Sequence, residues 1–422
     1  IEYNNIEVEE NIESLFFDGP GFYIRKIDDK AELINSVFIE NVSPGQDNTI
    51  LAKNPIDENS YILADFRPDI DDGMYHYYAI VFDEELNIVD SLDEISGVGH
   101  RIVQGGPYFS DSVIINKDVK DKIKELIPLA PLHNPAHITG IEAFEEVLPN
   151  VVNVAVFDTA FHQTMPIENF LYGTPYEWYT ENKVRKYGAH GTSHAYVAKV
   201  YGETVNKPLE GTKVITCHIG NGASITAVKD GKCLDTTMGL TPLDGFPMGT
   251  RSGHMDPTVI SYIAGERNME LKSIINALNK ESGYKGISGL SHDSRDLEKA
   301  IEVGSKPDAT DAEKELARRC SLAFDVQFKR ICDYIGSYYV LMGGCDAIIF
   351  TAGIGENSAY LREKVCDRLA ALGVKINKEL NNDNSIRGKI TNISADDAKV
   401  QTWIIPTNEE LVIARDVVRL TK

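Results

Sequence analysis

Two arginines on glycine-flanked turns have the chemistry to bind a phosphate or a carboxylate. Arg101 lies in GHRIVQGG, residues 99–106, and Arg251 lies in GLTPLDGFPMGTRSG, residues 239–253. A guanidinium group offers planar, bidentate donors to either anion. A histidine beside them would add an imidazole. Phosphoryl transfer needs such a set, because the migrating group spreads negative charge over its equatorial oxygens. We therefore expect these three side chains to converge as one cationic site.

A carboxylate and a second imidazole join this set of candidates. Asp158 follows a predicted strand over residues 151–157, at the edge of an open α/β sheet where ligands usually bind. His133 lies in LAPLHNP, residues 129–135. Structural alternatives remain open: Arg101 as an ordinary ion-pair partner, Asp158 as the cap of the turn that follows it, and His133 as a helix cap.

The remaining polar clusters favour structural roles. His162 is expected to be a hydrogen-bonded structural histidine, and Thr192 and His194 to cap a helix that starts near Ala195. A histidine metal site is a weaker alternative, because His190 and His194 form only a lone i, i+4 pair without a third ligand. Ser193 lacks the GxSxG context of a hydrolase nucleophile.

A third candidate is the stretch AIIFTAGIGENS, residues 347–358. An apolar run ends in a glycine-rich turn, and the turn opens into a helical pattern. Gly353 and Gly355 would let the backbone approach a ligand, and a helix N-terminus offers unpaired N–H groups to an anion. The pattern predicts a nucleotide site, although many α/β proteins use such turns only for packing.

The elements that would position these residues mix strands and helices along the chain. Asn221-Gly222 and Asp230-Gly231 are strong hairpin signals, so the strands around them are antiparallel. Thr407 and Glu410 have capping-box spacing, which leaves Glu409 without a structural role. The predicted strands are residues 75–86, 151–157, 213–218, 223–228 and 402–405, together with the apolar run that opens residues 347–358. The predicted helical segments are 118–127, 140–148, 256–282, 308–342 and 407–419. This pattern favours α/β layers with mixed sheets.

Length and charge limit the possible functions. With 422 residues the chain is expected to form two domains. Its formal charge of −22 argues against nucleic acid or an anionic membrane as a partner. None of the six cysteines forms a CxxC pair, which favours reduced thiols and a cytoplasmic location. The sequence contains no membrane span and no secretory signal.

Taken together, these segments resemble the acetokinase family of the acetate and sugar kinase/actin superfamily, from about Gly97 to Lys422. The resemblance implies two ribonuclease H-like domains with mixed sheets and a central cleft. It divides the chain into residues 1–160 plus 410–422, which bind the acyl group, and residues 161–409, which bind nucleotide and dimerise. It implies reversible transfer of the ATP γ-phosphoryl group to acetate or another short-chain carboxylate, with Mg²⁺ or Mn²⁺, in a homodimer.

The resemblance also implies roles for single residues. Arg101 and Arg251 bind the carboxylate and the phosphoryl group, His190 contacts that group in flight, Asp158 acts as the acid/base or positioning group, and His133 supports the transition state. Glu409 is the implied metal ligand, and Val103, Leu132 and Pro242 line the acyl pocket. The implied ATP-binding residues are His218, Ile219, Gly220, Asn221, Gly222, Asp293, Ser294, Arg295, Gly353, Ile354, Gly355, Glu356 and Asn357.

Three features depart from the family pattern. The family's opening strand and its Asn-x-Gly-Ser-Ser-Ser turn are not found in a sequence that starts at Ile1, so we expect that first hairpin to be missing from the chain as given. The alternative function for a protein without this hairpin is that of a catalytically silent nucleotide-binding member of the same fold. Ala189 replaces a phenylalanine that helps to close the acyl pocket, which suggests a larger pocket that tolerates propionate or butyrate. Gln104 replaces a histidine, and a neutral hydrogen bonder is expected to suffice there.

Overall fold

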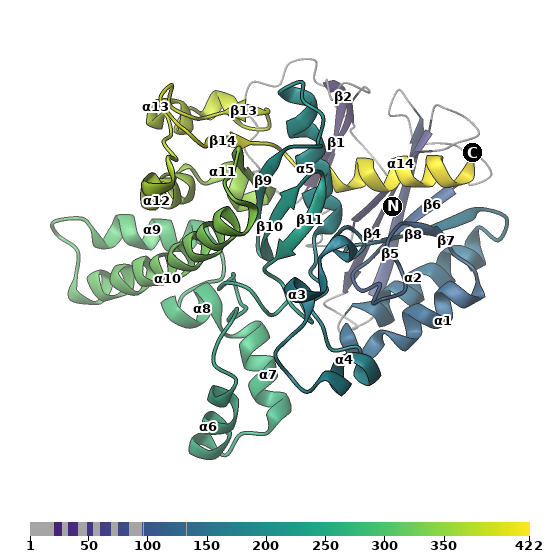
Figure 1. Ribbon diagram of the computed structural model, residues 1–422, viewed down its shortest axis with the longest axis horizontal. Helices are drawn as coiled ribbons and strands as arrows, with labels where there is room; N and C mark the ends of the chain where they lie inside the picture. The colour runs from purple at the N-terminus through teal and green to yellow at the C-terminus, as the bar shows by residue number, and fades with distance from the viewer. Residues whose placement is uncertain are drawn as a thin grey trace. The chain divides into compact units, whose positions relative to one another are not determined.

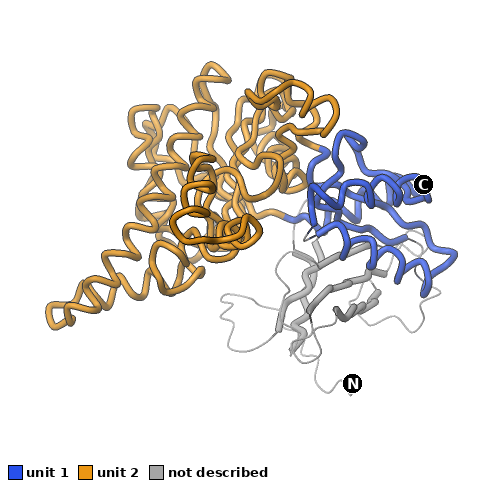
Figure 2. Tube along the Cα trace, turned by 90° about the horizontal axis from the view of Figure 1, so that it is seen from below, with its two compact units in different colours: residues 1–160, 408–422 blue, residues 161–407 orange. Residues whose placement is uncertain are grey.

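The computed structural model describes five early strands by their backbone and then the chain from residue 95 onward, except for residues 96 and 132. The chain folds into two compact units, which Figure 2 colours separately. Unit 1 comprises Ile1–Ala160 and Asn408–Lys422, and unit 2 comprises Phe161–Thr407. The chain therefore enters unit 2 after Ala160 and leaves it after Thr407.

Unit 2 is built on a six-stranded mixed sheet with the order β11-β10-β9-β12-β14-β13 (Figure 1). Its strands are β9 (Lys213–Ile219), β10 (Ala223–Lys229), β11 (Lys232–Thr236), β12 (Ala347–Thr351), β13 (Thr391–Asn392) and β14 (Gln401–Ile404). The first three form an antiparallel meander, while β12 runs parallel to both β9 and β14. The prediction of a mixed sheet is confirmed.

The hairpin turns of the meander follow from their sequences. Asp230 and Gly231 have φ angles of 55° and 72° between β10 and β11. Two successive left-handed residues are the signature of a type I′ turn, which asparagine, aspartate and glycine tolerate best. The Asn221-Gly222 turn joins β9 to β10, with Ile219 opposite Ala223.

The two faces of this meander differ in chemistry because side chains alternate along a strand. Ile215, Cys217 and Ile225 belong to the apolar core of unit 2, together with Phe324 and Phe328 of the long helix α10 (Asp311–Met342). The alternate positions of the same strands carry buried polar residues instead, namely Thr216, His218, Ser224 and Thr226. Hydrogen bonds join three of these four residues to the helix α5 (Gly191–Thr204) or to His190 before it.

The remaining helices of unit 2 surround this sheet. They are α3 (Ile167–Phe170), α4 (Tyr176–Asn182), α6 (Thr258–Arg267), α7 (Leu271–Lys280), α8 (Gly283–Ser288), α9 (Ser294–Gly304), α11 (Ala352–Asn357), α12 (Ala359–Arg368) and α13 (Lys378–Asn381). Thr310 and Glu313 form a capping box at the start of α10. The segment predicted as helical over residues 256–282 divides into α6 and α7, because the chain turns through a left-handed Asn268 with φ of 49°.

Unit 1 contains a small mixed sheet with the order β6-β8-β7, formed by β6 (Gly97–Ile102), β8 (Val152–Phe157) and β7 (Val113–Ile114). Its helices are α1 (Lys117–Glu125), α2 (Asn134–Val147) and α14 (Glu409–Thr421). Helix α14 packs closely on β6: a Cβ atom at Gly99 would lie 2.3 Å from Ile413 Cγ2. Glycine at this position therefore lets the helix reach the sheet.

The other described strands of unit 1 are antiparallel. β1 (Gly21–Ile27) pairs with β2 (Leu33–Glu40), and β3 (Thr49–Lys53), β4 (Ser60–Pro68) and β5 (Tyr75–Asp83) form a three-stranded sheet. The predicted strand over residues 75–86 is thus present up to Asp83. In the part of the chain that the structure describes, no helix combines the length and the apolar character needed to cross a membrane.

Candidate active site

His190 occupies an unusual backbone conformation directly before α5. Its φ and ψ angles of 58° and 23° are left-handed. This conformation costs a non-glycine residue about 1–2 kcal/mol. The imidazole is 8% exposed, lies 2.9 Å from the Ser224 hydroxyl through Nδ1, and stacks on His218 with ring centroids 4.1 Å apart. These contacts hold the ring in one orientation.

The glycine turn between β9 and β10 brings Arg251 next to His190. A Cβ atom at Gly222 would lie 3.2 Å from Arg251 Nη1 and 3.5 Å from His190 Nε2. The same Arg251 Nη1 donates to the carbonyl oxygen of Pro242 at 3.4 Å. Glycine thus lets both side chains lie against the backbone of this turn, at the end of β9. An anion bound at this turn would face a guanidinium and an imidazole together.

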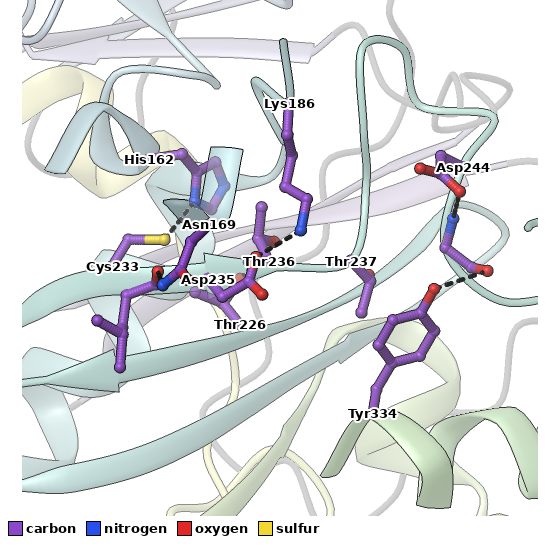
Figure 3. A network of polar contacts seen from close by, with 12 residues as sticks. His162, Asn169, Lys186, Thr226, Cys233, Asp235, Thr236, Thr237, Asp244 and Tyr334 are labelled. Carbon is purple, nitrogen blue, oxygen red and sulfur yellow. Dashed lines mark hydrogen bonds and ion pairs between the residues drawn. The ribbon is translucent and has the colours of Figure 1, made fainter. Parts of the chain in front are cut away.

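The segment that leads to His190 is fastened to β11 (Figure 3). Lys186 forms an ion pair with Asp235 at 2.5 Å, although burial raises the pKa of that carboxyl. His162 lies 2.8 Å from the Ala189 carbonyl oxygen and 3.1 Å from Cys233 Sγ. The expectation that His162 is a hydrogen-bonded structural histidine is confirmed.

The predicted nucleotide turn differs from its expected form. The chain reverses at Ala352, with φ of 64°, and residues 352–357 form the short helix α11 before α12 begins. A Cβ atom at Gly355 would lie 3.4 Å from the Cys217 carbonyl oxygen, whereas one at Gly353 would meet no heavy atom within 4 Å. Gly355 therefore serves packing, and Gly353 faces open space. Gly220 lies beside this turn, because its Cβ would be 3.9 Å from Ala352 Cβ.

Two buried charged residues stabilise the turn. Glu356 Oε1 accepts hydrogen bonds from the backbone N–H groups of Ala352 at 2.7 Å and Thr407 at 3.1 Å, and burial raises the pKa of this carboxyl. Arg362, 2% exposed, donates through Nη1 to the carbonyl oxygens of Gly355 at 3.0 Å and Glu356 at 2.7 Å. Burial lowers the pKa of Arg362 to about 10, so it is charged at neutral pH.

The segment Asp293–Arg295 lies near the hairpin turn. Asp293 caps α9 by accepting from the Arg295 N–H, and its carboxylate pairs with the Arg295 guanidinium at 2.6 Å. Hydrogen bonding from Arg295 lowers the pKa of Asp293. A Cβ atom at Gly249 would lie 2.3 Å from Asn221 Oδ1 and 3.1 Å from the carbonyl oxygen of His292. The predicted nucleotide segments around Asn221, Asp293 and Gly353 thus belong to one region of unit 2.

Unit 1 carries the second group of predicted residues. Arg101 forms a bidentate pair with Asp158: Nε lies 3.0 Å from Oδ1 and Nη2 lies 2.8 Å from Oδ2. Glu409 Oε2 lies 3.8 Å from the same Nη2. The Asp158 side chain is 1% exposed, whereas that of Arg101 is 15% exposed. Two carboxylates thus flank one guanidinium. That Arg101 converges with Arg251 and His190 of unit 2 stays a prediction.

Two histidines, His100 and His137, lie near Arg101. His133 precedes α2 at the N-cap position but makes no side-chain cap hydrogen bond. Burial, followed by the nearby His133, Arg101 and His100, lowers the pKa of His137 to about 3. Burial also lowers the pKa of His100 to about 4. His100 and His137 are therefore neutral at pH 7 and add no charge beside the guanidinium.

The predicted acyl-pocket residues are only partly described. Val103 and Pro242 are half-buried, and Leu132 lies outside the described residues. Ala189 is 3% exposed and belongs to the apolar core of unit 2. The Gln104 side chain accepts from the Gly106 N–H at 2.8 Å, so the neutral amide at this position shapes the turn after β6.

The comparisons with known proteins bear on this arrangement. A model of the acetokinase family matches residues 26–415. The chain belongs to the acetokinase family. It is 56% identical to the acetate kinase of Acholeplasma laidlawii over 336 residues, which cover 80% of this chain and 81% of that protein. It is 47% identical to the acetate kinase of Thermoanaerobacterium thermosaccharolyticum over 90% of this chain and 91% of that protein.

Solved structures of this family have the same fold. The crystal structure of Porphyromonas gingivalis acetate kinase superposes with a TM-score of 0.75 at 36% identity, covering 89% of this chain and all of that one. A propionate kinase from Francisella tularensis superposes with a TM-score of 0.73 at 36% identity, covering 88% of this chain and all of that one.

Two helix caps in this chain were predicted wrongly. The position before α5 is taken by His190, while His194 lies inside the helix and bonds to Thr216 and Ser224. Thr192 also lies inside α5. The cap of α14 is Asn408, whose side chain accepts from the Leu411 N–H. The hydroxyl of Thr407 instead donates to Ser193 at 2.7 Å, so Thr407 and Glu410 form no capping box.

Several residues that support the site were not predicted. Thr216 and Ser224 hold the imidazoles of His194 and His190, and Arg362 holds the turn of α11. A signal for Thr216 and Ser224 exists in KVITCHI and ASITAVK, where Thr, His and Ser alternate with apolar residues in fully buried strands. Polar residues at every second position of a buried strand indicate a polar layer on one face of the sheet. Arg362 had no comparable signal.

Proposed function

We propose that this protein is an acetate kinase, which transfers the γ-phosphoryl group of ATP to acetate and gives acetyl phosphate and ADP reversibly. The observation that carries the proposal is the pairing of Arg251 and His190 beside Gly222. A guanidinium and an imidazole that lie together against a glycine turn suit an anionic group in transit. Relatives named acetate kinase at 47–56% identity support it.

The roles of the polar residues follow from their chemistry. Arg251 and His190 would neutralise the charge on the phosphoryl oxygens, and Arg101 would bind the acid. Acetate is already ionised at neutral pH, since carboxyl groups ionise near pH 4. No general base is therefore needed. Asp158 accepts two hydrogen bonds from Arg101 and would orient that guanidinium. His133 would support the transition state from the start of α2.

The glycine turns of unit 2 supply the nucleotide site. His218–Gly222 would contact the β- and γ-phosphates, and Asp293–Arg295 with Gly353–Asn357 would hold the adenosine. The open space at Gly353 and the rigid support of the turn by Arg362 favour this assignment. Backbone N–H groups of such turns bind phosphates without a steric penalty.

Residues at the start of α14 fit a divalent cation that the nucleotide brings with it. No group of three or more His, Cys, Asp or Glu side chains that could hold a metal occurs among the described residues. Mg²⁺ often binds through one or two carboxylates, water and substrate phosphates, so a single Glu409 suffices as the protein ligand. When bound, Mg²⁺ or Mn²⁺ would neutralise charge on the phosphate oxygens.

A kinase for a longer short-chain acid is the second candidate. The residue at position 189 favours this candidate. Ala189 precedes His190 at a position where the family pattern has a phenylalanine, and the smaller side chain would leave a wider acyl site. Val103, Leu132 and Pro242 would line the remainder of the acyl site. The similarity to a propionate kinase structure, at a TM-score of 0.73, agrees with this alternative.

We also propose a homodimer. Helices α6 and α7 carry large exposed apolar side chains, including Tyr262 at 66%, Leu271 at 63% and Val259 at 40%. None of the residues of α6 is buried within the chain. A second copy of this chain would remove these side chains from water.

Acetyl phosphate formation tests the proposed function. The purified protein, ATP, Mg²⁺ and acetate are incubated with hydroxylamine, which traps acetyl phosphate as the hydroxamate. We expect product only when both ATP and acetate are present. Arg251→Ala should lower kcat by about 10³-fold or more, the loss expected when an arginine on transferring phosphate is removed. The exposed Arg318→Ala is the control and should keep full activity. Absence of product from the unmodified protein would refute the proposal.

A further inference from the structure

The buried hydroxyl of Ser224 lies between two imidazoles. Its oxygen is 2.9 Å from His190 Nδ1 and 2.7 Å from His194 Nε2. Ser224 is fully buried. A hydroxyl has one proton and can donate to only one of these nitrogens. The other nitrogen must therefore carry a proton of its own, so the protonation of the two rings is linked through Ser224.

Thr216 sets the direction of this link. Its hydroxyl donates to the carbonyl oxygen of Thr226 at 3.4 Å, and its oxygen lies 2.7 Å from His194 Nδ1. Because a carbonyl oxygen only accepts, a Thr216 proton directed at Thr226 leaves the Thr216 oxygen to accept from Nδ1–H of His194. Burial lowers the pKa of His194 well below its usual value, so this ring is neutral and has a single proton. Its Nε2 is bare and accepts from Ser224.

We propose that Thr216, His194 and Ser224 form a hydrogen-bond relay with a fixed direction, which keeps a proton on Nδ1 of His190. Ser224 donates to His194, so its oxygen accepts from His190 Nδ1–H. A neutral His190 then presents a lone pair at Nε2, the atom that lies beside Gly222 and Arg251. Nε2 carries a proton only when the whole ring is an imidazolium. Thr216, His194 and Ser224 are thus positioning residues.

The consequence for catalysis rests on the proposed function. A phosphoryl oxygen beside Gly222 needs a donor, because a lone pair on Nε2 would repel it. The relay therefore makes the imidazolium of His190 the active form, and the negative charge of the phosphoryl group favours that form. Without a bound anion, the neighbouring Arg251 disfavours a second positive charge on His190. The arrival of the anion and the protonation of His190 are coupled.

The groups that face His190 come from several elements. His194 lies on its own helix with ring centroids 6.5 Å away, and His218 stacks on it from β9 at 4.1 Å. Arg251 approaches from the loop after β11, and β10 contributes the neutral hydroxyl of Ser224. His162 in turn lies against His194, with centroids 5.8 Å apart. Any pH dependence of His190 reflects this whole set.

The substitution Thr216→Val tests the direction of the relay without altering His190 or Ser224. Valine keeps the shape of threonine but offers no acceptor to His194 Nδ1. The His194 proton then moves to Nε2, where Ser224 accepts it, and Ser224 donates to His190 Nδ1. Neutral His190 should thereby change from the Nδ1–H to the Nε2–H tautomer. The matched control is Thr226→Val, which removes another buried hydroxyl, one that bonds to Thr236 at 2.8 Å and to neither imidazole.

Nuclear magnetic resonance of ¹⁵N-histidine-labelled protein without ligands reports the tautomer directly, with His190 assigned by the signal that His190→Asn removes. We expect Nδ1–H in the unmodified protein and in Thr226→Val, and Nε2–H in Thr216→Val. A second measurement of the same relay is the dependence of kcat on pH. In the unmodified protein kcat should fall about tenfold per pH unit once His190 loses its second proton, and this fall should be weaker in Thr216→Val.

Two results would overturn the relay. One is an Nε2–H tautomer of neutral His190 in the unmodified protein, a measurement that decides the question even where Thr216→Val does not fold. The other is an unchanged tautomer and pH profile in a folded Thr216→Val variant. Failure of the proposed function would look different, because the tautomers would be as expected while the protein formed no acetyl phosphate.

Discussion

At the scale of single residues, His190 combines an unfavourable backbone conformation with a buried imidazole. The residue adopts a left-handed backbone and is almost fully buried, in contact with a second imidazole and a buried hydroxyl. The left-handed backbone and the burial of the imidazole are unfavourable, and the ring and hydroxyl contacts offset this cost. Strained residues that are held by such dense contacts are typical of functional sites, which agrees with a role for His190 in phosphoryl transfer.

Acyl-chain preference is a prediction that depends on Ala189. If alanine leaves the acyl site wider, kcat/KM should stay within about tenfold from acetate through propionate to butyrate, since a tight pocket discriminates by 10–200-fold per methylene. Initial rates with the three acids at fixed ATP measure this. Ala189→Phe should restore a preference for acetate, with Ala189→Val as an intermediate case. A steep drop at propionate in the unmodified protein would contradict a wide pocket.

Glu356 predicts a pH dependence of stability. Burial raises the pKa of this carboxyl in the folded state above its unfolded value of about 4.3. A raised folded pKa contributes stability below the unfolded pKa, and that contribution is lost as pH rises through the folded pKa. Glu356→Gln keeps the acceptor oxygen that binds Ala352 and Thr407 but cannot ionise. Its stability relative to the unmodified protein should therefore increase from pH 5 to pH 8.

Urea unfolding at a series of pH values measures this difference. The control is Glu315→Gln, at an exposed carboxylate whose pKa is lowered by hydrogen bonding to Arg318. This carboxyl is ionised in both the folded and the unfolded state above pH 5, so the stability difference between Glu315→Gln and the unmodified protein should stay constant from pH 5 to pH 8. A difference between Glu356→Gln and the unmodified protein that does not change with pH would show that Glu356 ionises as readily when folded as when unfolded.

At the scale of elements, the sequence predicted the framework better than the connections. The hairpins at Asn221-Gly222 and Asp230-Gly231 were predictable because turn chemistry is local. The short helix α11 and the cap at Asn408 were not, since each depends on partners distant in the chain: Thr407 bonds to Glu356 and Ser193 rather than capping α14. The site residues were found mainly by resemblance, whereas their supporting hydroxyls depend on how β9 and β10 face α5.

Arg362 offers a test of how far one side chain supports an element. It donates to the carbonyl oxygens of Gly355 and Glu356 and, through Nε and Nη2, to the side chain and backbone of Asn381. Hydrogen bonds to a charged group are each worth about 1.5–3 kcal/mol. Arg362→Met should therefore lower the free energy of unfolding by at least about 3 kcal/mol and weaken ADP binding. Denaturant unfolding and a direct binding assay measure both effects.

A matched comparison is available on the same helix. Arg368 is partly exposed and pairs with Asp325 at the surface. Exposed ion pairs contribute about 0–1 kcal/mol, so Arg368→Met should leave stability and ADP affinity nearly unchanged. Equal losses from the two variants would mean that α12 as a whole, rather than the bonds of Arg362, supports the turn of α11.

At the scale of the whole molecule, the net charge of the protein has the same sign as the charge of its proposed substrates. The formal charge is −22, yet the proposed substrates are anions. The described groups that would bind the transferred phosphoryl group and the acid are local, namely Arg251 and His190 in unit 2 and Arg101 in unit 1, where two carboxylates flank the guanidinium. The protein therefore repels its substrates at long range and attracts them only at contact distance.

The repulsion between the negatively charged protein and an anionic nucleotide predicts that nucleotide association becomes faster with added salt. The Debye length shortens from about 30 Å at 0.01 M to about 8 Å at 0.15 M, so salt screens the net charge at long range more than the contacts in the site. The association rate of a fluorescent ADP analogue, measured by stopped flow, should rise about threefold over this range of KCl. A fluorescent adenosine has no charge, so its rate should stay constant and exclude a general effect of salt on the protein. A rate for the ADP analogue that falls with salt would mean that the local cations, not the net charge, steer the encounter.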